Sequence, residues 1–210
     1  HLPDNVSFIS GAMVEPASIS MHGLKLAKVN ENSKVLITGC GAIGMFAAAD
    51  AHALGIKNVY ITEANLDRVE MAKNSGFVKE AFNAKDEQLD EKLSAVAPNG
   101  FDAVIECSGN KTASTTGMNH LKKGGEMVLI AYGESPEINV FNFVNSELHL
   151  SGSLFFKTTE FEEVIELMHE GKLNLEPYSK LIEMEEVQSS LEKLEKGIES
   201  PIKYVIKMND

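Results

Sequence analysis

The chain has 210 residues, enough for one large domain with a sizeable hydrophobic core. Its hydrophobic content of 43% and charged content of 24% are ordinary for a folded globular protein and argue against general disorder. The formal net charge of −12 argues against nucleic acid or an anionic membrane as a partner, and no apolar run reaches the roughly 20 residues that cross a bilayer.

Short strands and helices alternate along the first three quarters of the chain. Strands are expected at 34–38, 58–62, 78–82, 101–106, 127–131 and 148–155, and helices at 42–54, 66–74, 87–96 and 111–121. Gly55 and Gly76 are expected to end two helices, and the Gly124–Gly125 pair to turn the chain into the fifth strand. This alternation predicts an α/β fold, a doubly wound parallel sheet of the Rossmann type with helices on both faces.

The C-terminal part of the chain has a different pattern. A helix is predicted at 159–170, with capping-box spacing between Thr159 and Glu162. A second apolar stripe consists of Met184, Val187, Leu191 and Leu194. A last strand is expected at 201–208, and the acidic excess on these helices is interpreted as solvated surface.

The most informative stretch is VLITGCGAIG at 35–44, where Gly39, Gly41 and Gly44 match G-x-G-x-x-G between a strand and a helix. Gly39 permits the tight turn, Gly41 lets a pyrophosphate approach the backbone, and Gly44 lets the helix pack against the strand. The amides of the first helical turn, which contains Ala42 and Ile43, would then face the phosphates.

An acidic residue, Glu63, follows the second strand 19 positions after the last of these glycines (63 − 44 = 19). A carboxylate there can accept hydrogen bonds from the hydroxyls of an adenine ribose and would repel a 2′-phosphate, so we expect NAD rather than NADP. Arg68 either lies over the adenine or pairs with a surface acid such as Asp67 or Glu70, and the sequence leaves both open. The alternatives are a glycine-rich turn of another α/β protein and, as a ligand, S-adenosylmethionine, whose folds also place an acid after the second strand.

The two cysteines, Cys40 and Cys107, are spaced neither as a disulfide framework nor as a metal knuckle, and with no signal peptide they favour a cytoplasmic location. Cys40 is interpreted as a small residue that fits the turn rather than as an activated thiol. Cys107, Ser108 and Gly109 follow the fourth strand and should line the cofactor cleft. No base near Cys107 in the sequence would activate it as a nucleophile, so no catalytic residue is assigned.

Five segments follow one another along the chain: EPASISMHG, VLITGCGAIG, VYITEANLDRVEMAKNSG, FDAVIECSGN and LKKGGEMVLIAYG. In this order they resemble the medium-chain, zinc-dependent alcohol dehydrogenases. The polyol branch, typified by sorbitol dehydrogenase, is nearest, and threonine dehydrogenase is close behind. The resemblance extends over essentially the whole chain.

The resemblance implies which residues bind the cofactor. They are Gly39, Gly41, Ala42, Ile43, Gly44, Glu63, Arg68, Cys107, Ser108, Gly109, Gly152, Ser153 and Leu154. The last three match a segment whose backbone holds the nicotinamide carboxamide, and the loop after Ala131 matches the nicotinamide side. Glu15 matches a position beside the catalytic zinc in polyol members. Without the resemblance, Glu15 would be an ordinary helix charge before Pro16, and His22 a packed or surface histidine.

Family members begin with a catalytic domain that supplies a cysteine and a His-Glu pair to the zinc, and no cysteine precedes Cys40 here. We therefore expect residues 1–30 to be a linking helix region from that absent domain, 31–175 a Rossmann NAD-binding domain, and 176–210 a helix and strand that return to it. Because the first residue is His1, we expect a processed or excised piece of a longer chain, or a residue left by cloning.

The function implied is that of the cofactor part of an NAD-dependent zinc-type dehydrogenase, in which a hydride passes from a secondary alcohol to NAD. Zinc would belong to the parent enzyme, so this chain should be inactive alone and bind little zinc. The expected substrate is a small alcohol or polyol, with sorbitol, another polyol, a sugar phosphate and threonine left open.

A homodimer or homotetramer through the edge strand Glu147–Phe156 is expected. The other functions considered are a stand-alone NAD-binding regulatory module and an S-adenosylmethionine-dependent methyltransferase.

Overall fold

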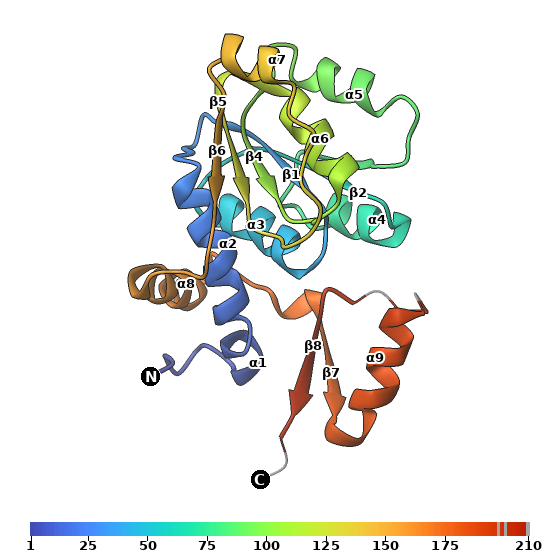
Figure 1. Cartoon of the computed structure of the whole chain (residues 1–210). Coiled ribbons are helices and arrows are strands. Elements are labelled where there is room, and N and C mark those ends of the chain that lie inside the picture. The colour runs from blue at the N-terminus through green and yellow to red at the C-terminus, as the bar shows by residue number, and fades with distance from the viewer. Residues whose placement is uncertain (197, 200, 209–210) are drawn as a thin grey trace.

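A computed structural model describes residues 1–196, 198–199 and 201–208 (Figure 1). Six parallel strands form one sheet in the order β3-β2-β1-β4-β5-β6, and β7 and β8 form a separate parallel pair. The strands are β1 (Lys34–Thr38), β2 (Asn58–Glu63), β3 (Glu80–Asn83), β4 (Phe101–Glu106), β5 (Leu121–Leu129), β6 (His149–Gly152), β7 (Ser179–Glu183) and β8 (Lys203–Lys207). The strand order is that of a doubly wound dinucleotide fold, and the predicted fold class is confirmed.

Helices cover both faces of the six-stranded sheet (Figure 1). The helices of the described chain, including those outside the sheet layers, are α1 (Phe8–Gly11), α2 (Val14–Leu26), α3 (Ala42–Ala53), α4 (Leu66–Asn74), α5 (Leu89–Val96), α6 (Lys111–Asn119), α7 (Val140–Asn145), α8 (Thr158–His169) and α9 (Val187–Glu195), with 3₁₀ turns at Glu176–Tyr178 and Met184–Glu186. Successive residues of β1 serve opposite faces, because Val35 and Ile37 pack with α2 and α3 while Leu36 packs with α5 and α6. Burial on both faces explains why the strands read as continuous apolar runs.

The fifth strand begins earlier than the sequence indicated. The expected strand at 127–131 starts in the structure at Leu121, and the preceding helix ends at Asn119 rather than at 121. The Gly124–Gly125 pair therefore lies inside β5, where the pairing with β4 breaks register and Gly124 has φ +71°. A residue without a Cβ lets the strand bulge outward at this point, so a glycine pair does not have to mark a strand boundary.

The sixth strand is shorter than predicted. The expected strand at 148–155 is limited to β6, His149–Gly152, because its partner β5 ends at Leu129, which pairs with Gly152. Phe155, beyond the strand, adopts φ +55°, which is not an extended conformation. The helix α7 that precedes it was not predicted. Since β6 is the last strand in the sheet order, one of its sides has no strand partner in the described chain.

The capping box predicted at Thr159 and Glu162 is wrong by two residues. The N-cap of α8 is Lys157, whose backbone N–H donates to the Glu160 carboxylate at 2.6 Å. Glu160 is buried and also contacts His22 Nδ1 at 2.9 Å, so α8 is joined to α2. The interpretation of His22 as a packed histidine is confirmed.

The C-terminal unit consists of β7, β8 and α9, and lies below the carboxyl ends of the main sheet in Figure 1. The predicted strand at 201–208 is β8, but its partner β7 was not predicted. The second apolar stripe is only partly covered, because Met184 and Leu191 are exposed. No helix among the described residues is long and apolar enough to cross a membrane.

Candidate functional site

The glycine-rich turn connects β1 to α3 as the spacing predicts. Gly39 follows β1 with φ +90°, and its N–H donates to the Thr62 carbonyl of β2 at 2.8 Å. A Cβ on Gly39 would lie 2.9 Å from Ser108 Cα, so the turn also packs against the segment after β4. Glycine is required here both for the left-handed backbone and for the close approach.

The other two glycines of the motif have different surroundings. A Cβ on Gly44 would lie only 1.8 Å from the Gly39 carbonyl oxygen, so this glycine lets α3 pack against the turn. Gly41 is the N-cap of α3, and a Cβ there would meet no atom within 4 Å. Its bare backbone therefore faces open space at a helix N-terminus, the arrangement that accepts an anionic phosphate. Ile43 lines a cavity described below, while Ala42 packs against the core.

Glu63, at the end of β2, is held against the same turn. Its Oε2 accepts a hydrogen bond from the Cys40 N–H at 2.6 Å, and its Oε1 accepts one from the Asn65 N–H at 2.8 Å. A carboxylate can accept about four hydrogen bonds, so both oxygens retain free acceptor positions. The acid is thus fixed in place beside the bare backbone of Gly41 before any ligand binds.

Two cationic residues lie near Glu63, and the sequence analysis identified only one of them. Arg68 lines the cleft, and its Nε is covered without a hydrogen-bond partner among the described residues. Neither proposed surface pairing forms there, because no ion pair joins Arg68 to Asp67 or Glu70, and Glu70 pairs with Lys73 at 2.7 Å. The second cationic residue, Lys85, comes from the loop after β3 and was missed because its place beside Glu63 depends on the pairing of β2 with β3.

A buried carboxylate that the sequence analysis also missed shapes the segment after β4. Glu106 Oε1 accepts hydrogen bonds from the N–H groups of Ser108 and Gly109 at 2.8 and 3.0 Å, and from the Ser108 hydroxyl. Gly109 has φ +63°, and a Cβ on it would lie 2.7 Å from the Tyr132 carbonyl oxygen. Glu106 therefore fixes the turn whose residues face the cleft. Its position inside ECSG was the available sequence signal.

The carboxyl ends of β1, β2 and β4 enclose a cleft of about 620 Å³. Its lining residues are Gly39, Gly41, Thr62, Glu63, Ala64, Arg68, Ala84, Lys85, Leu89, Cys107, Ser108, Asn110, Thr112, Ala113 and Thr116. Parallel α/β sheets bind ligands at this edge, where the strand order reverses between β1 and β4. A cleft that combines apolar surface with one acid, two cations and bare backbone suits an adenosine diphosphate.

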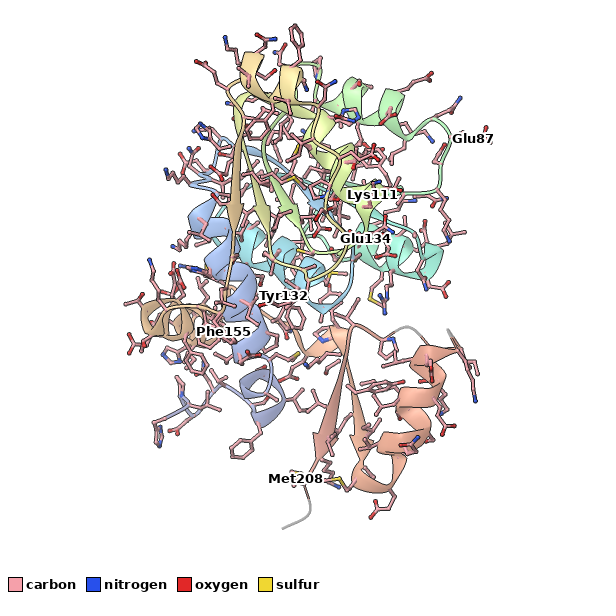
Figure 2. All side chains as sticks on the ribbon, viewed as in Figure 1. Glu87, Lys111, Tyr132, Glu134, Phe155 and Met208 are labelled. Carbon is pink, nitrogen blue, oxygen red and sulfur yellow. The ribbon has the colours of Figure 1, made fainter. Side chains whose placement is uncertain are left out.

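A smaller and more apolar cavity of about 280 Å³ adjoins this cleft at Cys107, which lines both. Its other lining residues are Ile19, Ile43, Ile130, Ala131, Tyr132, Ser153, Leu154 and Phe155. Figure 2 shows Tyr132 and Phe155 on the side of the sheet that faces α2 and the β7–β8 pair. Of the predicted carboxamide segment, Ser153 and Leu154 line this cavity, whereas Gly152 ends β6 and lines neither space.

Both thiols are kept neutral by their surroundings. Burial, followed by the nearby Glu63 carboxylate, raises the pKa of Cys40 to about 12, although Arg68 acts in the opposite direction. Burial, with Glu106 and Cys40 nearby, raises the pKa of Cys107 well above its usual value. These shifts favour the interpretation of Cys40 as a packing residue and leave Cys107 a poor nucleophile.

The comparison with protein families decides which family this fold and cleft belong to. Residues 42–170, more than half of the chain, match the family described as zinc-binding dehydrogenase. The chain belongs to the zinc-binding dehydrogenase family. This membership favours the dehydrogenase interpretation over the methyltransferase alternative.

Relatives of this zinc-binding dehydrogenase chain include a sorbitol dehydrogenase from Ovis aries, 30% identical over 179 residues, which are 84% of this chain and 50% of that protein. The fold resembles 2R,3R-butanediol dehydrogenase from Bacillus subtilis, with a TM-score of 0.89 at 23% identity over 99% of this chain and 60% of that chain. It also resembles an alcohol dehydrogenase from Escherichia coli CFT073 complexed with NADH, with a TM-score of 0.89 at 20% identity over 99% and 61% of the two chains. The chain spans about half the length of the curated relatives it matches.

Glu15, the predicted neighbour of a zinc ion, is exposed in the first turn of α2. Ile19, one helical turn after Glu15 on α2, lines the smaller cavity. Glu15 therefore lies on the same face of α2 as this cavity-lining residue. Among the described residues, no three or more His, Cys, Asp and Glu side chains are grouped as a metal site requires.

Proposed function

We propose that this chain is the cofactor-binding part of an NAD-dependent, zinc-type dehydrogenase that oxidises the CH–OH group of a small alcohol or polyol. The observation that carries the proposal is the position of Glu63. Backbone N–H groups of Cys40 and Asn65 hold its carboxylate. On the same wall of the larger cleft, Gly41 leaves the N-terminus of α3 without a covering side chain. A ribose and a diphosphate need such an acceptor and such a set of amides side by side.

The residues of the larger cleft have distinct roles in this proposal. The free acceptor positions of Glu63 bind the ribose hydroxyls, and the first-turn amides of α3 face the phosphates. Arg68, whose covered Nε has no partner among the described residues, covers the adenosine from α4 and donates to it. Glu63 and Asp67 line a shallow pocket that adjoins the cleft and disfavour a 2′-phosphate there, so NAD is preferred to NADP although Lys85 lines this pocket too.

The smaller cavity holds the nicotinamide end in this proposal. When bound, NAD supplies the ring carbon that accepts the hydride, and the protein positions that ring. The apolar side chains of Ile19, Ile43 and Ile130 exclude water from one side of it. Cys107, kept neutral by burial, adds no negative charge beside a cationic nicotinamide ring.

The remaining parts of the enzyme are assigned from the family and from the lengths of the relatives. We place the zinc ligands in a catalytic domain outside this chain, with Glu15 directed toward it, and keep the division into 1–30, 31–175 and 176–210. We further propose association through the edge that contains β6. In support, the outer side of β6 has no strand partner in the described chain, and Phe141 on the neighbouring α7 is 79% exposed.

The test is a titration of the chain with NADH, followed by the emission of the reduced nicotinamide, with NADPH in parallel. The chain contains no tryptophan, so protein emission contributes little background. We expect saturable binding of NADH and binding of NADPH at least about tenfold weaker, because one repelled phosphate is worth about 1.4 kcal/mol or more.

The variant that tests the site is Gly41→Val. A Cβ at this position meets no atom within 4 Å, so the fold has room for it, but the valine side chain would occupy the space that the diphosphate of the ligand needs. This variant should keep the fold, measured by circular dichroism, and lose NADH binding. Equal NADH affinity in Gly41→Val would contradict the proposal, and so would binding of S-adenosylmethionine in place of NADH. Turnover of sorbitol by the pure chain would contradict the assignment of the catalytic residues to another part of the enzyme.

A further inference from the structure

Ser153 has a hydroxyl group that the described chain leaves without a partner. Its backbone N–H donates to the Leu129 carbonyl at 2.9 Å and so continues the pairing of β6 with β5. Its side-chain Oγ is covered by protein but forms no hydrogen bond among the described residues. A covered hydroxyl without a partner costs free energy, because folding has removed the water to which it would otherwise bond.

The position of Ser153 indicates what could satisfy this hydroxyl. Ser153 lines the smaller cavity, and no lining residue of that cavity carries a charge. The other hydroxyl on its wall belongs to Tyr132, which is 90% exposed, and the Cys107 thiol is a weak donor. A wall of this kind suits a flat apolar ring that carries one neutral polar group, and does not suit a carboxylate or a phosphate.

We propose that the Ser153 hydroxyl hydrogen-bonds the carboxamide of the nicotinamide ring and so positions that ring in the smaller cavity. This inference rests on the proposed function, and adds a side-chain contact to the backbone contacts expected at 152–154. A rotation about χ1 moves the Oγ between staggered positions without any change in the backbone, so the hydroxyl reaches a ligand that enters beside it. Ser153 is therefore a positioning residue, and the hydride transfer itself involves no bond to it.

The experiment compares two ligands that share the adenosine diphosphate ribose part and differ in the nicotinamide. NADH is titrated by its own emission and ADP-ribose by calorimetry, against the wild-type chain and Ser153→Ala. We expect Ser153→Ala to bind NADH about fivefold to tenfold more weakly, which corresponds to the loss of one hydrogen bond, and to bind ADP-ribose as the wild type does. The thermal midpoint of the ligand-free variant should equal or exceed that of the wild type, because the substitution removes a hydroxyl that has no partner.

The matched control is Ser151→Ala, two residues earlier on β6. The Ser151 hydroxyl already donates to Glu126 Oε1 at 2.6 Å and lines neither space. Its loss should lower the thermal midpoint and leave the affinities for both ligands unchanged, which is the opposite pattern to Ser153→Ala.

Two results would overturn the inference about Ser153. One is an unchanged ratio of NADH to ADP-ribose affinity in Ser153→Ala, as expected if the hydroxyl holds only a structural water. The other is equal weakening of both ligands, which would place its effect in the fold. Failure of the wild-type chain to bind either ligand would overturn the proposed function, and this inference with it.

Discussion

The two ends of the proposed cofactor site are built in different ways. At the larger cleft, Glu63 and Glu106 each accept hydrogen bonds from backbone amides of the turns that form the wall, so the polar groups are fixed within the chain. At the smaller cavity, Tyr132, Leu154 and Phe155 are 90%, 61% and 67% exposed. The polar groups of the first end are held by hydrogen bonds within the chain, whereas much of the wall of the second end is exposed.

The contrast shows where binding energy and specificity are expected to arise. A preorganised polar wall loses little side-chain freedom when a ligand binds, so the adenosine half should provide most of the affinity of this chain. An exposed apolar wall contributes fully only when it is covered, so the nicotinamide half should gain affinity from whatever packs against it. The variants below weaken one end at a time.

The largest expected effect is that of Gly44→Ala. The added Cβ would lie 1.8 Å from the Gly39 carbonyl oxygen, so either the turn or α3 must move. We expect a loss of about 3 kcal/mol or more in the free energy of unfolding, measured by urea titration, together with loss of NADH binding. Gly41→Ala is the control, because its Cβ meets no atom within 4 Å, and its free energy of unfolding should stay within about 0.5 kcal/mol of the wild type. Similar stability in the two variants would contradict the packing role given to Gly44.

The next largest effect is expected at Glu63. Replacing it by alanine removes the acceptor for the ribose and frees the N–H groups of Cys40 and Asn65. We expect Glu63→Ala to bind NADH about tenfold to a hundredfold more weakly, since hydrogen bonds to a charged group contribute about 1.5–3 kcal/mol. The difference between NADH and NADPH should shrink as well. Glu70→Ala, which removes an exposed acid paired with Lys73, is the control and should leave both affinities unchanged.

Sequence-based prediction succeeded where neighbouring residues determine the structure. The strand Phe101–Glu106 and the helix Leu66–Asn74 have the predicted bounds, because their signals are local: a short apolar run for the strand, and apolar spacing with the closing Gly76 for the helix. The glycine motif also has the predicted form, since spacing alone places three glycines around one turn.

Where the structure depends on residues far apart in the chain, sequence-based prediction failed. Lys85 was not singled out, because its place beside Glu63 follows from the pairing of β2 with β3. Glu106 was missed although its hydrogen-bond partners are only two and three residues away, because a carboxylate at a strand end can equally be solvated and its burial depends on the whole fold. The strand predicted at 148–155 ends at Gly152, where its partner β5 ends, and the residue types of 153–155 carry no signal of that boundary. The strand β7 was missed because it is recognisable mainly through its pairing with β8.

The pH dependence of stability tests the burial of Cys40 in the glycine-rich turn. The pKa of Cys40 is about 12 in the folded chain and near 9 when unfolded, so its neutral thiol favours folding below pH 9. As the pH rises from 9 to 10, the Cys40 thiol ionises in the unfolded chain but not in the folded chain, so we expect Cys40 by itself to lower the free energy of unfolding by about 1 kcal/mol. Cys107, whose pKa is also raised, adds to this decline. Cys40→Ala should show a shallower decline over this interval. Rapid alkylation of Cys40 in the folded chain at pH 8 would contradict its burial.

The smallest effect is expected at the exposed end of the site. Tyr132→Ser removes a side chain that is largely in solvent, so the free energy of unfolding should change by less than about 0.5 kcal/mol. ADP-ribose affinity should not change, because Tyr132 does not line the larger cleft. A large loss of stability, measured by thermal melting, would show that this wall is already covered in solution.

The cleft holds the chain's only guanidinium group, because Arg68 is the one arginine among 210 residues. A reagent selective for guanidinium groups, such as phenylglyoxal, therefore has a single target in the whole molecule. The mass added to the intact chain reports on one side chain, and protection by a nucleotide reports on the occupancy of one cleft. The wild-type protein thus carries a built-in, site-specific chemical probe of ligand binding that needs no engineered label.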